Sequence, residues 1–453
     1  MKRYETYKDS GIQWVGEIPS HWDVVKTSYL FDDIGSGTTP NTNDDSLYDT
    51  DNGINWLQTG DLNDGHITKT SKKISQKAIE GNGTLRLYPI NSLVIALYGA
   101  TIGKVGVLDI ESTTNQACCV LPPSDKISTD FAYYIFLASK EALLNLASGG
   151  GQPNISQAII KNHRIPYPSY AEQQSIVSFL EDKVGKIDAA IAEKEQMLED
   201  LKAYRSSIIS EAVTKGLDKN VEMKDSGIEW IGIIPKTWKI VRIKHILDYK
   251  TDSLRVGPFG SSLSGNDFKT EGYWVYNQRV VLDNNFNSND TFVSQEKYKE
   301  LSSFKVFAGD ILLTTRGTIG KVAIVPNTFH EGVLHPCLIR FRVDDSIVNK
   351  DFLAYYFNDT NLILDQVKYN SNSTTIDVIY SYTLKELIIS LPPLDVQNDI
   401  VAHLNYKVQK IDEMLKEASQ SVENLKSYKS TLITEAVTGK IDLRDWKLKE
   451  EKV

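Results

Sequence analysis

Residues 8–22 read KDSGIQWVGEIPSHW and residues 224–238 read KDSGIEWIGIIPKTW, with ten identities in fifteen positions at an offset of 216. Self-similarity at such a spacing indicates that one structural unit is written twice along the chain. The pentapeptide TIGKV supports this interpretation, because it occurs at 101–105 and again at 318–322. Each copy follows an apolar β-branched run, so we expect a tight turn after a buried strand in both halves.

A second repeated feature is a long segment without proline and with at most one glycine, found at 171–214 and at 395–438. Both segments should be helical. In each, positions spaced alternately by three and four residues form an apolar seam of the coiled-coil type, with nine of eleven positions apolar in the first and ten of eleven in the second. The seam positions are Val177, Leu180, Val184, Ile187, Ile191, Lys194, Leu198, Leu201, Arg205, Ile208 and Ala212, and then Val401, Leu404, Val408, Ile411, Leu415, Ala418, Val422, Leu425, Lys429, Leu432 and Ala436.

Each seam is about 50 Å long at the helical rise per residue. An apolar stripe of that length needs a partner in water, so we expect the two helices to pack on each other. The alternative is that each helix packs only within its own half. Both seams carry a cation at the equivalent position, Arg205 and Lys429, and we expect that end of each seam to face solvent or a partner protein.

Composition limits the class of protein further. The 453 residues include 41% apolar and 24% charged residues, which is typical of a folded chain of two to four domains. The segments outside the helices combine short β-branched runs, turns and brief helical patterns, which predicts an α/β globule in each half. The net charge of −9 excludes a uniformly basic coat, so any contact with DNA must use local basic surface. Three cysteines and the lack of a long apolar stretch indicate a cytoplasmic protein outside the membrane.

Motifs for catalysis are lacking. The segment GATIGK at 99–104 has three residues between its glycines and is followed by Val105, whereas a Walker loop needs four and then Ser or Thr. No [DN]-P-P-[YF] motif of adenine methyltransferases occurs, and the E-x-K at 222–224 stands alone in a linker. The seven histidines form no cluster with cysteines or carboxylates, so no metal site is expected. The sequence therefore predicts a binding protein rather than an enzyme.

Polar side chains at the ends of apolar strands are the candidate binding residues. Amides and guanidinium groups can contact base edges, although capping of a turn is the equally simple alternative. Lysine and arginine near the repeated turns are candidate phosphate contacts, with solvated surface charge as their alternative. The base-edge candidates are Gln58, Thr59, Asn277, Gln278 and Arg279, and the phosphate candidates are Lys104, Lys161, Arg316 and Lys321.

The whole pattern resembles the specificity subunit of type I restriction-modification enzymes. The resemblance rests on the KDSG segments at 8 and 224, the TIGK turns at 101 and 318, and the helix motifs KVGKID at 183 and KVQKID at 407. It implies two α/β target-recognition domains, each followed by one long helix, with the helices paired as an antiparallel coiled coil in a pseudo-twofold repeat. The corresponding ranges are 1–170 and 220–394 for the recognition domains, 171–219 and 395–445 for the helices, and 446–453 for a polar tail.

The resemblance also implies the function. Each recognition domain would bind one half of an asymmetric, bipartite double-stranded DNA target, while the helices set the spacing and dock two methyltransferase subunits. Restriction and translocation subunits would join through that complex. S-adenosylmethionine, ATP and magnesium would belong to these partners, leaving this chain a non-catalytic subunit of a DNA adenine methyltransferase and endonuclease complex. The loops that differ between the halves add Gln152 and Asn154, in GGGQPNIS at 149–156, as DNA-binding candidates.

Besides an enzyme in which one globule carries a methyltransferase or nuclease activity without a recognisable motif, two alternatives remain at this point: a specificity subunit of a fused nuclease-methyltransferase system, and a coiled-coil adaptor that binds DNA without sequence preference. A structural expectation also follows from the repeat. Helix one continues directly into the second KDSG segment, whereas the first KDSG segment has no helix before it. If the halves are related by a pseudo-twofold axis, 11–22 must lie against the end of helix two, at 434–442.

Overall fold

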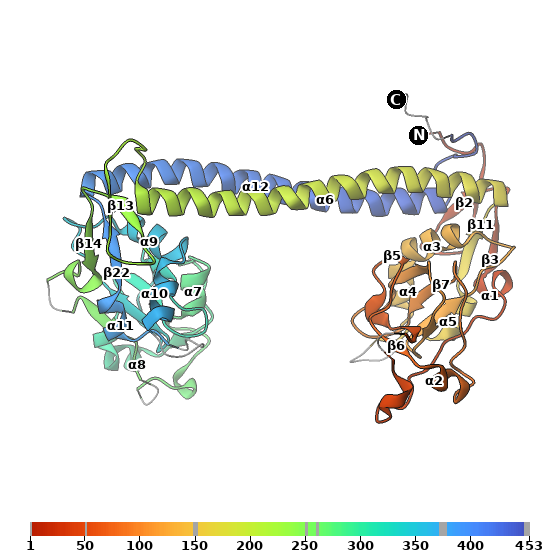
Figure 1. Ribbon diagram of the computed structural model, residues 1–453, viewed down its shortest axis with the longest axis horizontal. Coiled ribbons are helices and arrows are strands. Elements are labelled where there is room, and N and C mark those ends of the chain that lie inside the picture. Colours follow the sequence, from red (N-terminus) through yellow and green to blue (C-terminus); the bar gives the residue numbers. More distant parts are fainter. Residues whose placement is uncertain are drawn as a thin grey trace. The chain divides into compact units, whose positions relative to one another are not determined.

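The computed structural model describes residues 2–49, 52–147, 153–249, 252–259, 262–370 and 378–447. The chain forms two compact units, of which unit 1 combines two segments that are far apart in the sequence and unit 2 is one continuous segment. Unit 1 comprises Met1–Glu195 and Gln420–Val453, and unit 2 comprises Gln196–Ser419 (Figure 1). The predicted combination of two α/β globules with long helices is confirmed.

Unit 1 is built from small sheets with short helices around them. A hairpin and a two-stranded sheet connect the globule to the long helices, and a four-stranded and a three-stranded sheet form the rest. The strand pairs and sheets are β1 (Tyr7–Asp9) with β2 (Glu17–Pro19); β3 (Asp23–Lys26) with β11 (Arg164–Tyr167); β10 (Cys118–Leu121), β7 (Leu93–Ala96), β8 (Val105–Leu108) and β5 (Gly65–Ile67); and β6 (Lys73–Ile74), β4 (Ile54–Leu57) and β9 (Thr113–Thr114). The helices are α1 (Thr27–Leu30), α2 (Gln76–Glu80), α3 (Thr129–Ala138), α4 (Lys140–Asn145) and α5 (Gln157–Asn162).

Unit 2 repeats this plan, as the sequence repeat predicts. Its sheets are β12 (Met223–Asp225) with β13 (Ile233–Pro235); β14 (Lys239–Arg242) with β22 (Ile388–Leu391); β15 (Leu254–Val256), β21 (Leu338–Phe341), β18 (Ile311–Thr314) and β19 (Val322–Ile324); and β17 (Phe292–Val293), β16 (Tyr273–Tyr276) and β20 (Gly332–Leu334). Its helices are α7 (Gln278–Leu282), α8 (Gln295–Glu300), α9 (Lys350–Asn358), α10 (Leu362–Asn370) and α11 (Ser381–Glu386). Every residue of the central strands β7 and β18 is buried, because both faces of these strands are covered.

The two long helices are α6 (Tyr170–Lys215) and α12 (Leu394–Val437), within one residue of the predicted segments at each end. Within unit 1, Lys429 of α12 donates to the Asp188 carboxylate of α6 at 2.6 Å, and Lys426 donates to Glu195 at 3.1 Å. Within unit 2, the Arg205 Nε donates to Asp412 at 2.9 Å. Each seam cation thus pairs with an aspartate of the other helix, which the sequence pattern did not predict, and stays partly open to solvent, with side chains 30% exposed at Lys429 and 27% at Arg205.

The predicted contact between the N-terminal segment and the end of α12 is confirmed within unit 1. The Tyr7 hydroxyl donates to the Gly439 carbonyl at 3.1 Å, and the Asp442 amide donates to the Lys2 carbonyl at 2.9 Å. Gly439 has φ +70°, and a Cβ there would lie 2.4 Å from the Pro19 ring, so only glycine fits this turn. Among the described residues, no helix is long and apolar enough to cross a membrane.

Candidate nucleic-acid interface

Four segments of unit 2 meet at one edge through backbone hydrogen bonds. The His335 amide donates to the Tyr276 carbonyl at the end of β16, at 2.9 Å. The Thr315 amide, just after β18, donates to the Cys337 carbonyl, and the Ile379 amide donates to the Thr315 carbonyl, both at 2.9 Å. We call the residues that these bonds bring together, 277–279, 315–318, 335–337 and 378–379, the polar edge of unit 2.

Unit 1 contains the same arrangement of backbone bonds. The Asn115 amide donates to the Leu57 carbonyl at 3.0 Å, the Leu97 amide donates to the Ala117 carbonyl at 2.8 Å, and the Ile155 amide donates to the Leu97 carbonyl at 2.8 Å. These bonds define the polar edge of unit 1, residues 58–59, 97–101, 115–117 and 154–155. One scaffold thus presents two different sets of side chains.

The structure brings several predicted residues of unit 2 together at its polar edge. Asn277 caps α7, since its Oδ1 accepts from the amides of Arg279 at 3.0 Å and Val280 at 3.3 Å. Gln278 Nε2 donates to the Thr318 carbonyl at 3.0 Å and so ties α7 to the TIGK turn. Arg279 and Arg316 are both exposed. Capping, the simple alternative for Asn277, is thus its observed role in this state.

In unit 1 the predicted residues lie at the equivalent places. Gln58 precedes the short 3-10 helix Thr59–Asp61 as its N-cap, and Thr59 is the first residue of that helix. The backbone amide of Gln58 donates to the Asp61 carboxylate at 2.9 Å. Asn154 is exposed and forms an isolated β-bridge with Tyr98, just before the TIGK turn. Gln152 lies outside the described residues.

The other three phosphate candidates are less exposed than Arg316. The Lys321 ammonium donates to the carbonyl of Asn358 at the end of α9, so its side chain leaves the polar edge. Lys104 is half-buried and ends the TIGK turn just before β8, where its amide donates to the Thr101 carbonyl at 2.9 Å. Lys161 is half-buried in α5. Arg316 is therefore the most exposed of the four phosphate candidates, and it lies within the polar edge of unit 2.

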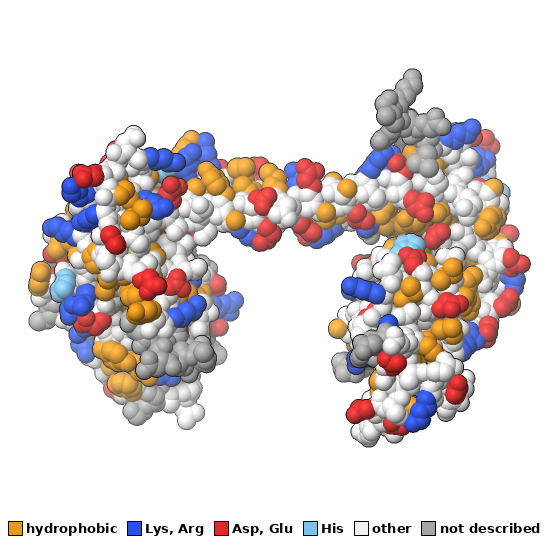
Figure 2. Space-filling model, in the orientation of Figure 1, with side chains coloured by type: hydrophobic (Ala, Val, Ile, Leu, Met, Phe, Trp, Pro, Cys, Tyr) orange, Lys and Arg blue, Asp and Glu red, His pale blue; other side chains and the backbone are white. Residues whose placement is uncertain are grey.

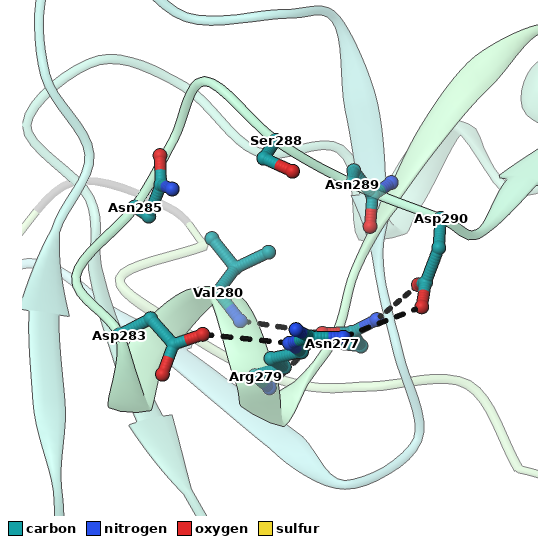
Figure 3. A pocket seen from close by; sticks show the side chains of 8 residues that line it. All are labelled: Asn277, Arg279, Val280, Asp283, Asn285, Ser288, Asn289 and Asp290. Carbon is teal, nitrogen blue, oxygen red and sulfur yellow. Dashed lines mark hydrogen bonds and ion pairs between the residues drawn. The ribbon is translucent and has the colours of Figure 1, made fainter. Parts of the chain in front are cut away.

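An open pocket of about 140 Å³ beside the polar edge of unit 2 was not predicted (Figure 3). It lies between α7 and the loop 283–290, whose sequence DNNFNSND is rich in Asn, Asp and Ser. That composition is the signal that could have identified it, because such side chains both form turns and contact base edges. The lining residues are Asn277, Arg279, Val280, Asp283, Asn285, Ser288, Asn289 and Asp290.

Charge in this pocket is mixed rather than uniformly basic. The Arg279 Nε lies 3.4 Å from the Asp283 carboxylate and its Nη1 lies 3.9 Å from Asp290. Asp290 in turn accepts from the Thr291 hydroxyl at 2.8 Å. On the face drawn in Figure 2, cationic and anionic side chains are likewise interspersed over both units. The pocket can therefore offer hydrogen-bond donors and acceptors side by side.

Among the described residues, no group of histidine, cysteine and acidic side chains could hold a metal ion. The adjacent thiols of Cys118 and Cys119 in unit 1 are also poorly suited to nucleophilic chemistry. Burial raises the pKa of Cys119 to about 12, and burial likewise raises the pKa of Cys118 far above its ordinary value. These thiols stay protonated at neutral pH and act as apolar core groups.

Comparison with known proteins gives a consistent result. A family model described as type I restriction modification DNA specificity domain matches residues 19–200 and 235–424. The type I restriction enzyme MjaIX specificity subunit of Methanocaldococcus jannaschii is 25% identical over 457 residues, which cover 98% of each protein. A chain from a structural study of type I R-M complex assembly matches with a TM-score of 0.71 at 15% identity, covering 94% of this chain and 99% of that one. The HsdS subunit from Thermoanaerobacter tengcongensis matches with a TM-score of 0.52 at 16% identity, covering 94% and 98%.

Proposed function

This chain belongs to the type I restriction-modification DNA specificity family, and we propose that it is the sequence-specific DNA-binding subunit of a type I restriction-modification complex. Each unit binds one half of a bipartite double-stranded target. The observation that carries this proposal is the repeated backbone scaffold of the two polar edges, which holds different side chains in each unit. Gln58 and Asn154 stand at one edge, and Arg279 and Arg316 at the other. Unequal edges favour an asymmetric target.

We further propose that α6 and α12 pair as an antiparallel coiled coil that fixes the spacing between the half-sites. The ion pairs in unit 1 support the antiparallel orientation. As α6 runs from Asp188 to Glu195, its partner on α12 changes from Lys429 to Lys426, which is the order expected of two helices that run in opposite directions. All twenty-two seam positions are buried or half-buried, as a paired seam requires. The equivalent pairs Asp188–Lys429 and Arg205–Asp412 fit a pseudo-twofold relation.

The partners in this proposal are DNA, two methyltransferase subunits, and restriction and translocation subunits that join through them. Two copies of the methyltransferase are supported by a repeated surface feature: Tyr204 and Tyr428 occupy equivalent positions on the helices and are 54% and 51% exposed. Exposed aromatic side chains are enriched at protein interfaces. S-adenosylmethionine, ATP and magnesium act in those partners, and this chain contributes specificity rather than catalysis.

Of the two alternatives, a subunit of a fused nuclease-methyltransferase system would use the same two units in the same way. A non-specific adaptor would need basic surface to bind phosphates, whereas the pocket of unit 2 places two carboxylates beside its one arginine. The sequence-specific role is therefore the better account of this site.

The proposal is tested by exchanging residues 1–170 for the recognition domain of a relative and mapping the methylated target of the assembled complex. One half-site should change, while the other half-site and the spacer length stay the same, because the scaffold of unit 2 and the helices are untouched. A complex in which both half-sites change together would show that the units do not read DNA independently.

A further inference from the structure

We propose that the pocket between α7 and the 283–290 loop reads one G·C base pair in the half-site bound by unit 2, with Arg279 contacting the guanine. This inference rests on the proposed function and gives it a specific contact. Arg279 is the central group, since its side chain is 77% exposed and two aspartates flank it. The remaining lining side chains are polar apart from Val280.

The carboxylates distinguish base contact from phosphate contact. Asp283 and Asp290 outnumber the single cation of the pocket, and their side chains are 58% and 68% exposed. A phosphate oxygen that approached Arg279 would also approach two like charges, which opposes binding. Base edges carry no net charge, and they offer amino groups that carboxylates can accept from. The pocket therefore suits a base pair and not the backbone.

The arrangement of donors and acceptors favours G·C over A·T. Asp283 lies 3.4 Å from Arg279 Nε, and Asp290 lies 3.9 Å from Nη1, which is beyond hydrogen-bond distance, so the terminal guanidinium nitrogens can still donate to two acceptors. Guanine offers two adjacent acceptors, O6 and N7, in the major groove, whereas adenine offers N7 beside an amino donor. The paired cytosine adds an N4 amino donor, and a carboxylate is its usual partner.

Asp290 is already oriented to accept that donor. Its Oδ1 accepts from the Thr291 hydroxyl at 2.8 Å and from Asn277 Nδ2 at 3.4 Å, so the carboxylate is held before DNA arrives. Preorganised groups lose less conformational entropy on binding.

Asn289 adds an unused acceptor. Its Nδ2 donates to the Thr291 carbonyl at 2.6 Å, while its buried Oδ1 has no hydrogen-bond partner among the described residues. Figure 3 shows this oxygen directed toward Asn277 and Arg279. A donor that reached this oxygen would satisfy a buried acceptor that lacks a partner in the described part of the chain.

The test compares Arg279→Gln with Arg316→Gln in the complex assembled with its methyltransferase subunits. Arg316 is the matched control, because it is an exposed arginine at the same polar edge and forms no ion pair within the described part of the chain. Binding is measured by fluorescence anisotropy on duplexes in which each base pair of the unit 2 half-site is replaced in turn, at several salt concentrations. Thermal melting shows that both variants are folded.

At one position of the half-site, where the wild-type target carries G·C, Arg279→Gln should reduce the preference for G·C over the other base pairs by roughly 10- to 100-fold. Arg279→Lys should retain part of this preference. Arg316→Gln should weaken binding to all duplexes equally and reduce the salt slope by about 1. Uniform weakening by Arg279→Gln, unchanged discrimination, or relaxation at an A·T position would each overturn the inference. A wild-type complex without any preferred target would instead overturn the proposed function itself.

Discussion

His163 links the N-terminal repeat segment to the globule of unit 1, and its protonation should control the stability of that contact. His163 follows α5 in the sequence. Its ring is stacked on the Trp14 ring, with 6.2 Å between the ring centroids, and lies next to the Phe136 ring, with 5.7 Å between the ring centroids. The residue is only 7% exposed, and its Nε2 has no hydrogen-bond partner among the described residues. Burial lowers the pKa of His163 to about 4, because a charged imidazole would lose its hydration there.

This depressed pKa predicts a pH dependence with a defined sign. Below an unfolded pKa of about 6.5 the unfolded chain takes up a proton that the folded chain refuses, so stability falls as pH falls toward about 4. The loss between about pH 7.5 and about pH 5 should be about 2 kcal/mol, measured by urea unfolding of unit 1. His163→Gln should remove this part of the pH dependence, whereas His403→Gln, at an exposed position, should keep it. Equal pH dependence in His163→Gln and the wild type would contradict the assignment.

Individual site residues were predicted where a strand end marks them. Arg279 and Arg316 follow apolar strands, and the meeting of such ends at one edge brought them together. Lys321 shows the limit of this reasoning, because its long side chain reaches the Asn358 carbonyl on α9, a partner 37 residues away that no local pattern reveals. The loop 283–290 was missed because it has no hydrophobic periodicity, which is the main signal that sequence provides.

At the scale of elements, the two long helices are the part of the fold that was predicted most accurately from the sequence. The lack of proline and the near lack of glycine over 171–214 and 395–438 predicted α6 and α12 to within one residue at each end, whereas the wider helix ranges 171–219 and 395–445 extend past the observed ends at Lys215 and Val437. The aspartate partners of the seam cations, Asp188 and Asp412, were not predicted, because they lie outside the apolar pattern. The seam itself varies along its length, since Ile191 is 9% exposed whereas Leu415 is half-buried.

This variation predicts how seam substitutions rank. Ile191→Ala should destabilise the helix pair by about 1.5 to 3 kcal/mol through lost apolar burial, and Ile191→Asp should cost more because a carboxylate enters the seam. Leu415→Asp should cost less than Ile191→Asp, because Leu415 is less covered. Thermal melting checks this order, with Ala192→Asp on the exposed face of α6 as the control. A melting temperature of Ile191→Asp equal to that of the wild type would show that the seam is not buried.

At the scale of the whole molecule, the sequence repeat explains why unit 1 is assembled from two distant parts of the chain, whereas unit 2 is one continuous segment. Unit 1 contains both the first KDSG segment and the end of α12, with the Tyr7 hydroxyl on the Gly439 carbonyl at 3.1 Å. Unit 2 holds the equivalent contact within one continuous stretch, where a Cβ on Gly216 would lie 3.3 Å from the Trp238 ring. This contact was predictable because the repeat fixes which segments correspond. The target sequence was not, since it depends on loop side chains that differ between the units.

The central claim is that this one chain supplies both halves of a bipartite specificity. The most direct measurement maps methylated adenines across the genome in cells with and without this gene. Our account predicts a single asymmetric motif, two short half-sites separated by a spacer of fixed length, that disappears when the gene is removed. Methylation that stays unchanged without the gene, or a motif that is contiguous rather than split, would contradict it.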